Sequence, residues 1–171
     1  MSDSLLADSA RLEFQQLLLP NGLKIERISV EATKTGLGKT IRFEEPPRVV
    51  AVLNESDLAA FIQPKLPPPV RSVDVQLVGG RIQVAAIAKV LIEVTALLIL
   101  RLEVVEQKEI HLRIESVDAP GPLEGIIENR IQDQNPIFEA KDVPIPIEIL
   151  GTRIEAGKLE IDARLTQLTL P

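Results

Sequence analysis

The stretch IQVAAIAKVLIEVTALLILRLEV, residues 82–104, decides the fold of this chain. All twelve of its even-numbered positions are apolar, and a strict period of two is the signature of a β-strand. The odd-numbered positions are mixed, because charged and polar residues stand among Ala85, Ile87, Leu91, Leu97 and Ile99. The sequence therefore predicts strand structure with one wholly apolar face and one half-apolar face.

This stretch is too long for one straight strand in a compact domain. No Gly, Pro, Asn or Asp occurs between Arg81 and Val117, so the usual turn residues are absent. A straight strand would span roughly 75 Å at about 3.3 Å per residue. A compact chain of this length is only about 40 Å across. We therefore expect the stretch to bend sharply, to coil around something, or to belong to an elongated molecule.

Length and charge limit the class of protein. The 171 residues suffice for one domain with a core, and no interior linker is long or polar enough to divide them. We expect a single domain over residues 1–171, with an N-terminal helix at 1–22 and a curved-sheet body at 23–171. The net charge of −6 argues against nucleic acid, because phosphate binding needs clustered Lys and Arg. The N-terminus lacks a basic region before an apolar core, which predicts no signal peptide and a cytoplasmic location, with membrane association left open.

The remaining sequence predicts helices and further strands. Apolar residues at helical spacing predict a helix over residues 4–19, stopped by Pro20-Asn21-Gly22. Two more helices are expected, over 55–63 with Asn54 as its cap and over 123–131. Alternating segments add up to about eight strands, mostly antiparallel neighbours. The expected fold class is α+β: a strongly curved antiparallel sheet wrapping or packing on two to three amphipathic helices.

Two features that suggest catalysis have simpler structural explanations. Residues 36–40, Gly-Leu-Gly-Lys-Thr, look like part of a phosphate-binding loop, but such a loop needs a glycine where Thr33 stands and a helix where a strand pattern follows. A hairpin turn is expected instead. The lone histidine, His111, lies on the polar side of an alternating segment, as a solvated residue would. Cysteine is absent. We therefore expect no enzyme, no catalytic residue, no metal and no cofactor.

Several hydrophobic patterns with their turns resemble a known family. They are VLNESDLAAFI (Val52–Ile62), VDVQLVGGRIQV (Val73–Val84), Leu112–Ile114 followed by a proline-interrupted helix, Pro146–Ile149 and Gly157–Ile161. Together they resemble the bacterial LmeA-like phospholipid-binding family over roughly residues 23–170. The resemblance implies a fold akin to tubular lipid-binding domains, in which a strongly curved antiparallel sheet wraps a helix and an apolar groove holds acyl chains. It implies no catalytic residue.

We expect a non-enzymatic protein that binds lipid or another apolar ligand in a groove between the curved sheet and the helices. The candidate lipid-binding residues are apolar side chains of these elements: Phe14, Leu17, Leu58, Phe61, Ile87, Leu97, Ile99, Ile126 and Ile127. The expected partner is phospholipid or another acyl-chain ligand, with a homo-oligomer and a peripheral membrane contact left open. The alternative is a structural or interaction module that self-associates through an apolar sheet face, because the odd face of residues 82–104 is half apolar.

Overall fold

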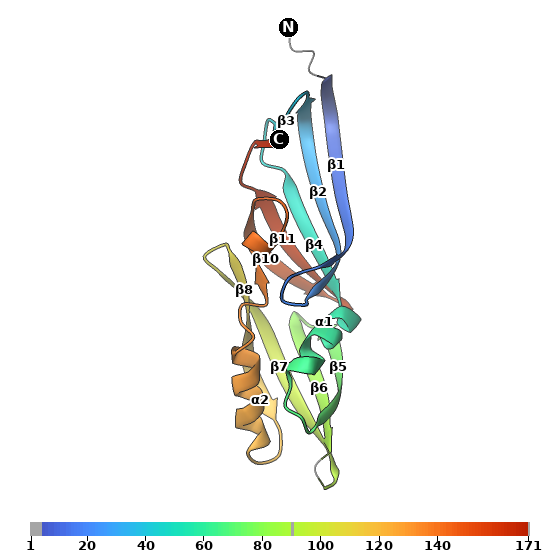
Figure 1. The fold of residues 1–171 in the computed structure, drawn as a ribbon, viewed down its shortest axis with the longest axis vertical. Helices are drawn as coiled ribbons and strands as arrows, with labels where there is room; N and C mark the ends of the chain where they lie inside the picture. The colour runs from blue at the N-terminus through green and yellow to red at the C-terminus, as the bar shows by residue number, and fades with distance from the viewer. Residues whose placement is uncertain (1–4, 90, 171) are drawn as a thin grey trace.

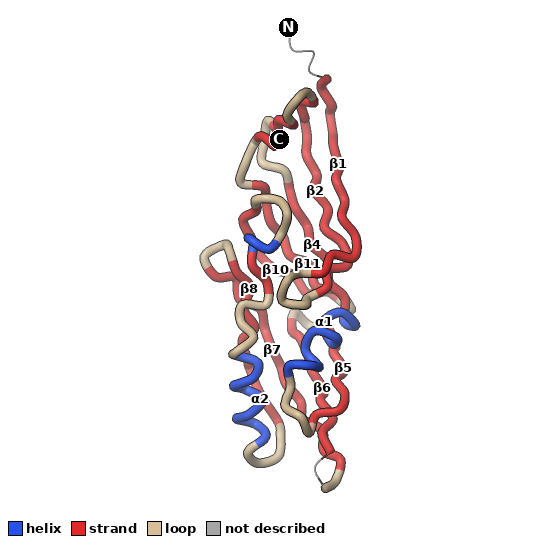
Figure 2. The backbone as a smooth tube through the Cα atoms, in the orientation of Figure 1, coloured by secondary structure: helices blue, strands red, loops and turns tan. Residues whose placement is uncertain are grey.

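The computed structural model describes residues 5–89 and 91–170 and shows an elongated molecule built mostly of antiparallel strands (Figure 1; Figure 2). Its solvent-accessible surface is 9888 Å², whereas a compact protein of this mass exposes about 8,300 Å². The strongly curved antiparallel sheet that the sequence predicts is confirmed, as a sheet strongly curled into a half-barrel. The strands form two sheets arranged end to end along the molecule, instead of one (Figure 1).

The seven-stranded sheet contains strands from both ends of the chain. Its path runs β10-β11-β4-β2-β3-β12, with β1 paired to the remaining edge of β2. The strands are β1 (Leu5–Leu18), β2 (Lys24–Leu37), β3 (Ile41–Phe43), β4 (Arg48–Asn54), β10 (Ile147–Glu155), β11 (Lys158–Leu165) and β12 (Thr169–Leu170). The outermost strands of this sheet include β1 and β10, which therefore each have one edge outside the sheet.

The five-stranded sheet has the order β5-β6-β7-β8-β9 and carries both helices on its buried face. Its strands are β5 (Val70–Val78), β6 (Arg81–Lys89), β7 (Glu93–Val105), β8 (Glu109–Asp118) and β9 (Phe138–Glu139). The helices are α1 (Glu55–Ile62) and α2 (Leu123–Gln132), with short 3-10 turns η1 (Gln63–Lys65) and η2 (Ala140–Asp142). One buried apolar cluster runs through both sheets and both helices. Over the described residues, neither helix has the length and apolar content that a membrane crossing requires.

Residues 82–104 fold into a hairpin, which is why they fit although they are too long for one straight strand. Lys89 pairs with Glu93, so the chain reverses between these two residues, and the expected sharp bend is confirmed. Val90, between them, lies outside the described residues. In every residue pair between β6 and β7, the two residue numbers add up to 182, an even number. Even-numbered residues therefore face even-numbered residues, and every fully buried residue of both strands is even-numbered. Three sequence positions separate the paired residues Lys89 and Glu93, and this odd spacing keeps the apolar parity intact, which is why the period of two hid the turn.

The predicted N-terminal helix is wrong, because residues 5–18 form strand β1; Ser4, where it was expected to begin, lies outside the described residues. Apolar residues four positions apart share a face on a helix, but they also share a face on a strand, where the period is two. Strand β1 pairs with β2 in one continuous register, from Leu5 opposite Leu37 to Leu18 opposite Lys24. Pairing with β2 therefore decided between two structures that the spacing alone allows.

Most other predicted elements are confirmed, with corrected numbers. The structure has two helices, the lower end of the expected range, and twelve strands among the described residues instead of about eight. The Gly-Leu-Gly-Lys-Thr segment contains the predicted hairpin turn, at residues 38–40 between the paired residues Leu37 and Ile41. Gly79 and Gly80 connect β5 to β6 with φ of +61° and +75°. Such a two-residue turn requires left-handed backbone at both positions, which favours glycine.

Asn54 caps helix α1 as the sequence predicts, and its replacement provides a first test. The Asn54 Oδ1 atom accepts a hydrogen bond of 2.8 Å from the backbone N–H of Asp57. We expect Asn54→Ala to lower the free energy of unfolding by about 1 kcal/mol, since that N–H loses its partner. Chemical denaturation measures the change. Ser56→Ala is the control, because it removes only the Ser56 hydroxyl bond to the same oxygen, of 2.8 Å, and leaves the backbone cap bond in place. An equal loss in both variants would contradict the assignment.

Candidate functional site

An apolar patch lies on the outer face of the five-stranded sheet, opposite the helices. Alternation places the odd-numbered residues of β6 and β7 on this face, and the register sets Ala85 directly opposite Leu97. Leu97 is 51% exposed, although it is a large apolar residue. The patch consists of Ala85, Ile87, Leu97 and Ile99. We name these four residues the outer patch.

Polar side chains enclose the outer patch on both sides. On β5, Asp74 pairs with Ala85 and Ser72 pairs with Ile87. On β8, Ser116 pairs with Ile99 and Asp118 pairs with Leu97. These four rim residues are exposed. An apolar surface with a polar rim is typical of a site that contacts a ligand, a partner or a membrane.

The outer patch contains an open depression of about 240 Å³. Ala85, Leu97 and Ile99 supply its apolar lining, and Asp74, Gln76 and Gln83 supply polar groups. The Gln76 side-chain amide donates a hydrogen bond of 3.4 Å to Asp74, which holds two rim groups beside each other. Gln76 also lies directly opposite Gln83. The depression therefore offers apolar contact at its centre and carboxylate and amide groups at its edge.

The hairpin between β6 and β7 ends in two exposed apolar side chains. Leu91 is 93% exposed and Ile92 is 72% exposed, and both lie between the paired residues Lys89 and Glu93. In Figure 1 this hairpin reaches the end of the molecule opposite the chain termini. The two side chains protrude from one end of the molecule, and the outer patch lies on the same two strands.

The nine candidate lipid-binding residues do not form one groove but lie in three places. Leu58, Phe61 and Ile127 are buried in the core, with at most 4% of their surface exposed. Phe14 and Leu17 are half-buried on β1 and pack against that core. The other four are on surfaces: Ile87, Leu97 and Ile99 belong to the outer patch, and Ile126 is 46% exposed on α2. The structure therefore brings together only the three residues of the outer patch on an accessible surface.

The ring of Phe61 is covered by a basic side chain. The Lys65 Nζ atom lies 3.9 Å from the centre of the Phe61 ring, a cation–π contact. Burial lowers the pKa of Lys65, because the charged amine loses water. Phe61 is thus packed between the core and Lys65.

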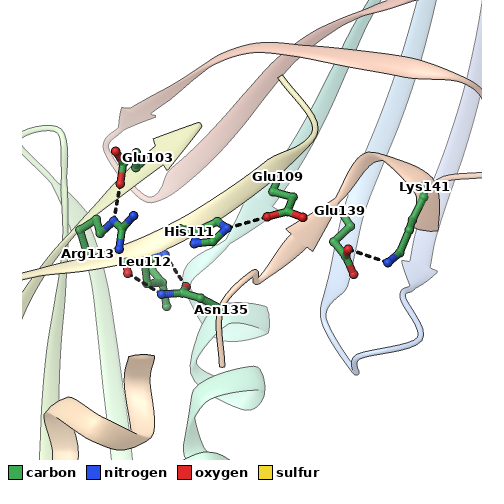
Figure 3. A network of polar contacts seen from close by, with 8 residues as sticks. All are labelled: Glu103, Glu109, His111, Leu112, Arg113, Asn135, Glu139 and Lys141. Carbon is green, nitrogen blue, oxygen red and sulfur yellow. Dashed lines mark hydrogen bonds and ion pairs between the residues drawn. The ribbon is translucent and has the colours of Figure 1, made fainter. Parts of the chain in front are cut away.

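The polar contacts around β8 are structural. His111 is hydrogen bonded to Glu109 at 2.8 Å, two residues away on the same strand (Figure 3). Arg113 donates to Glu103 on β7 and holds the pKa of that carboxyl below its ordinary value. The Asn135 side chain bonds both backbone groups of Leu112, at 2.7 and 2.9 Å, and so replaces a neighbouring strand at the edge of β8. None of these contacts places a nucleophile beside a base. No group of three potential metal-ligating side chains occurs within residues 5–89 and 91–170.

A second depression, of about 400 Å³, lies on the outer face of the seven-stranded sheet beside β1. Its lining is charged and includes Arg11, Glu31 and Arg48. Arg48 donates a hydrogen bond of 2.7 Å to Asp162, which raises the pKa of its guanidinium group. Charged side chains from three strands line this depression, whereas Ala85, Leu97 and Ile99 form the centre of the outer patch.

Sequence reasoning missed the polar rim, although a signal for part of it was present. The Gly79-Gly80 turn fixes Val78 opposite Arg81 and therefore fixes every other pair of β5 and β6. Counting back from the turn places Gln76 opposite Gln83 and Asp74 opposite Ala85. The rim on β8 depends on an irregularity in the register between Ile99 and Leu100, which no residue pattern reveals.

Comparison of the chain with protein-family models, curated proteins and solved structures finds no match.

Proposed function

We propose that this chain is a non-enzymatic binding protein for phospholipid or another acyl-chain ligand. The observation that carries the proposal is the outer patch, an apolar surface enclosed by polar side chains on both neighbouring strands. Its depression of about 240 Å³ is smaller than the roughly 300–1,000 Å³ of sites that enclose a whole small molecule. We therefore expect one acyl chain to lie along the patch while the polar headgroup stays in water. The resemblance to the LmeA-like pattern supports the same class of ligand.

The exposed hairpin end supports a peripheral contact with a membrane. Leu91 and Ile92 would reach the boundary between headgroups and acyl chains, while Lys89 stays at the aqueous surface. Two apolar side chains give only weak, reversible binding, on the order of 3–5 kcal/mol of burial. Binding between the sheet and the helices stays a prediction. It would require Leu58, Phe61 and Ile127 to separate, because all three lie in the core.

Replacement of Leu97 tests the proposal. We expect the unmodified chain to bind pyrene-labelled phosphatidylcholine, measured by fluorescence titration. Leu97→Asp should weaken this binding by at least about tenfold, because a carboxylate would be desolvated against the acyl chain. Leu150→Asp is the matched control, since Leu150 is also 51% exposed but lies on β10 of the other sheet. Absence of lipid binding by the unmodified chain, or an equal loss in both variants, would contradict the proposal.

A further inference from the structure

Over residues 5–15, the outer edge of β1 lacks the features that keep exposed strand edges from pairing; Gln16, with a φ of +56°, interrupts the regular strand near its end. Within residues 5–89 and 91–170, β1 pairs with β2 and with no other strand. Its fourteen residues contain no Pro, Gly or Lys. Those residues, together with bulges and coverage by other segments, are the usual protection of an edge strand. Strand β1 therefore presents a long row of backbone donors and acceptors that another strand can pair with.

The other long strands at the edges of the two sheets, β5, β8 and β10, are protected. Strand β10 follows Pro144 and Pro146 and has an irregular register at Leu150. The N–H of Ile149 in this strand donates a hydrogen bond of 2.8 Å to the Gln107 carbonyl. The edge of β8 is covered by β9 and by the Asn135 side chain. Strand β5 has an irregular register at Arg71, whose carbonyl accepts a hydrogen bond from a side chain. The contrast singles out β1 as the edge that is open to a partner strand.

The sequence of β1 is complementary to itself when two copies run antiparallel. Along a strand, the backbone groups of every second residue point to the same edge. Two identical antiparallel strands therefore pair residues whose numbers are both odd or both even, and the two numbers of each pair add up to an even number. If the two residue numbers of each pair add up to 24, the twofold axis lies at Leu12. Arg11 of each copy then lies opposite Glu13 of the other copy, which makes two such pairs. Sums of 22 and 26 instead set two Arg11 or two Glu13 side chains opposite each other. Opposite charges across an antiparallel pair are favourable and like charges unfavourable.

The apolar side chains agree with the same register. Residues Ala10, Leu12 and Phe14 pair on β2 with Ala32, Val30 and Ile28, all of which are buried. These β1 residues therefore face the core side of the sheet, where Leu12 remains 47% exposed. A sum of 24 sets Leu12 against Leu12 and Ala10 against Phe14 of the other copy. A sum of 20 instead sets Leu12 against Asp8, and a sum of 28 sets it against Gln16.

We propose that two copies of this chain associate by antiparallel pairing of their β1 strands about a twofold axis at Leu12. The pairing joins the two seven-stranded sheets into one continuous sheet and covers the exposed side of Leu12. Arg11 and Glu13 already pair with each other within each chain, at 3.0 Å, with side chains 55% and 29% exposed. The pairing of two copies adds a contact of each with its opposite in the other copy. It leaves the outer patch of the five-stranded sheet free.

Charge exchange tests the register. We expect sedimentation equilibrium to show a dimer, and Glu13→Arg to raise its dissociation constant by at least about tenfold, because two attractive pairs become repulsive. The double variant Arg11→Glu/Glu13→Arg should restore association, since opposite charges again meet across the axis. Glu155→Arg is the matched control, because Glu155 pairs with Arg153 two residues away on the other edge strand, at 3.3 Å. A chain that stays monomeric at every concentration, or a double variant as weak as Glu13→Arg, would overturn the proposal.

Thiol crosslinking gives an independent measurement that does not depend on affinity. The chain has no cysteine, so each introduced thiol is the sole one. Leu12→Cys should form a disulfide-linked dimer under mild oxidation, because opposite residues of an antiparallel pair are about 4.5–5.5 Å apart at Cα. Leu6→Cys should not, although Leu6 is 84% exposed, because the two copies of residue 6 would be roughly 40 Å apart. Equal crosslinking of both variants would overturn the register.

Discussion

Replacement of Leu98 by alanine should lower the free energy of unfolding by about 2–5 kcal/mol. Leu98 is 1% exposed, and its strand neighbours across β6 and β8 are Val84 and Val117. Removing most of its side chain leaves a cavity in a packed interior that relaxes only in part. Because a typical domain is stable by only about 5–15 kcal/mol, the loss is a large share of the total. Urea denaturation measures it.

The adjacent residue is the control for this prediction. Leu97 has the same side chain but is 51% exposed, because neighbouring residues of a strand point to opposite faces. We expect Leu97→Ala to change the free energy of unfolding by no more than about 0.5 kcal/mol. Loss of lipid binding in a Leu97 variant that remains stable would then report on the ligand and not on the fold. Similar losses of stability at both positions would show that the outer face is covered.

Phe138→Ala should lower the free energy of unfolding by about 3–5 kcal/mol. Phe138 is the largest of the fully buried side chains, and it lies in the two-residue strand β9 opposite Ile110. The backbone beside it is also fixed, because the Ile137 N–H donates to the Ile110 carbonyl at 2.9 Å. Truncation removes the side chain that holds this short segment against β8. Thermal and chemical denaturation both measure the effect.

The matched control for Phe138 is Phe43→Ala. Phe43 is half-buried in the short strand β3, where its backbone N–H donates to the Leu168 carbonyl. Its truncation should cost clearly less, since part of its side chain already contacts water. If the two variants lose the same stability, then the burial of Phe138 does not anchor the segment that carries it.

The sequence was sufficient to predict local features for which a few neighbouring residues allow only one backbone structure. Every fully buried residue of β6 and β7 is an even-numbered apolar position, because the strand period is fixed by the backbone. The Gly79-Gly80 turn and the Asn54 cap follow from the backbone geometry and hydrogen bonding that those residues provide. Phe138 had no such signal, because a two-residue strand has no period to detect.

The accessible part of the candidate site was only partly predictable for a similar reason. The half-apolar odd face was visible in the sequence, and Ile87, Leu97 and Ile99 do meet there. The same residue types at Leu58, Phe61 and Ile127 fill the core instead. An apolar side chain looks the same in a sequence whether a helix covers it or water does, so exposure depends on which elements pack on which face.

The sequence by itself determined which residues alternate, where the glycine turn lies and which residue caps the first helix, because each depends on a few neighbouring residues. Only the tertiary structure decided that residues 82–104 form a hairpin, since three positions between the paired residues Lys89 and Glu93 preserve the parity of both strands. It also decided that residues 5–18 form a strand. Their spacing suits helix and strand alike, and the choice depended on β2, a partner whose hydrogen bonds no local pattern contains.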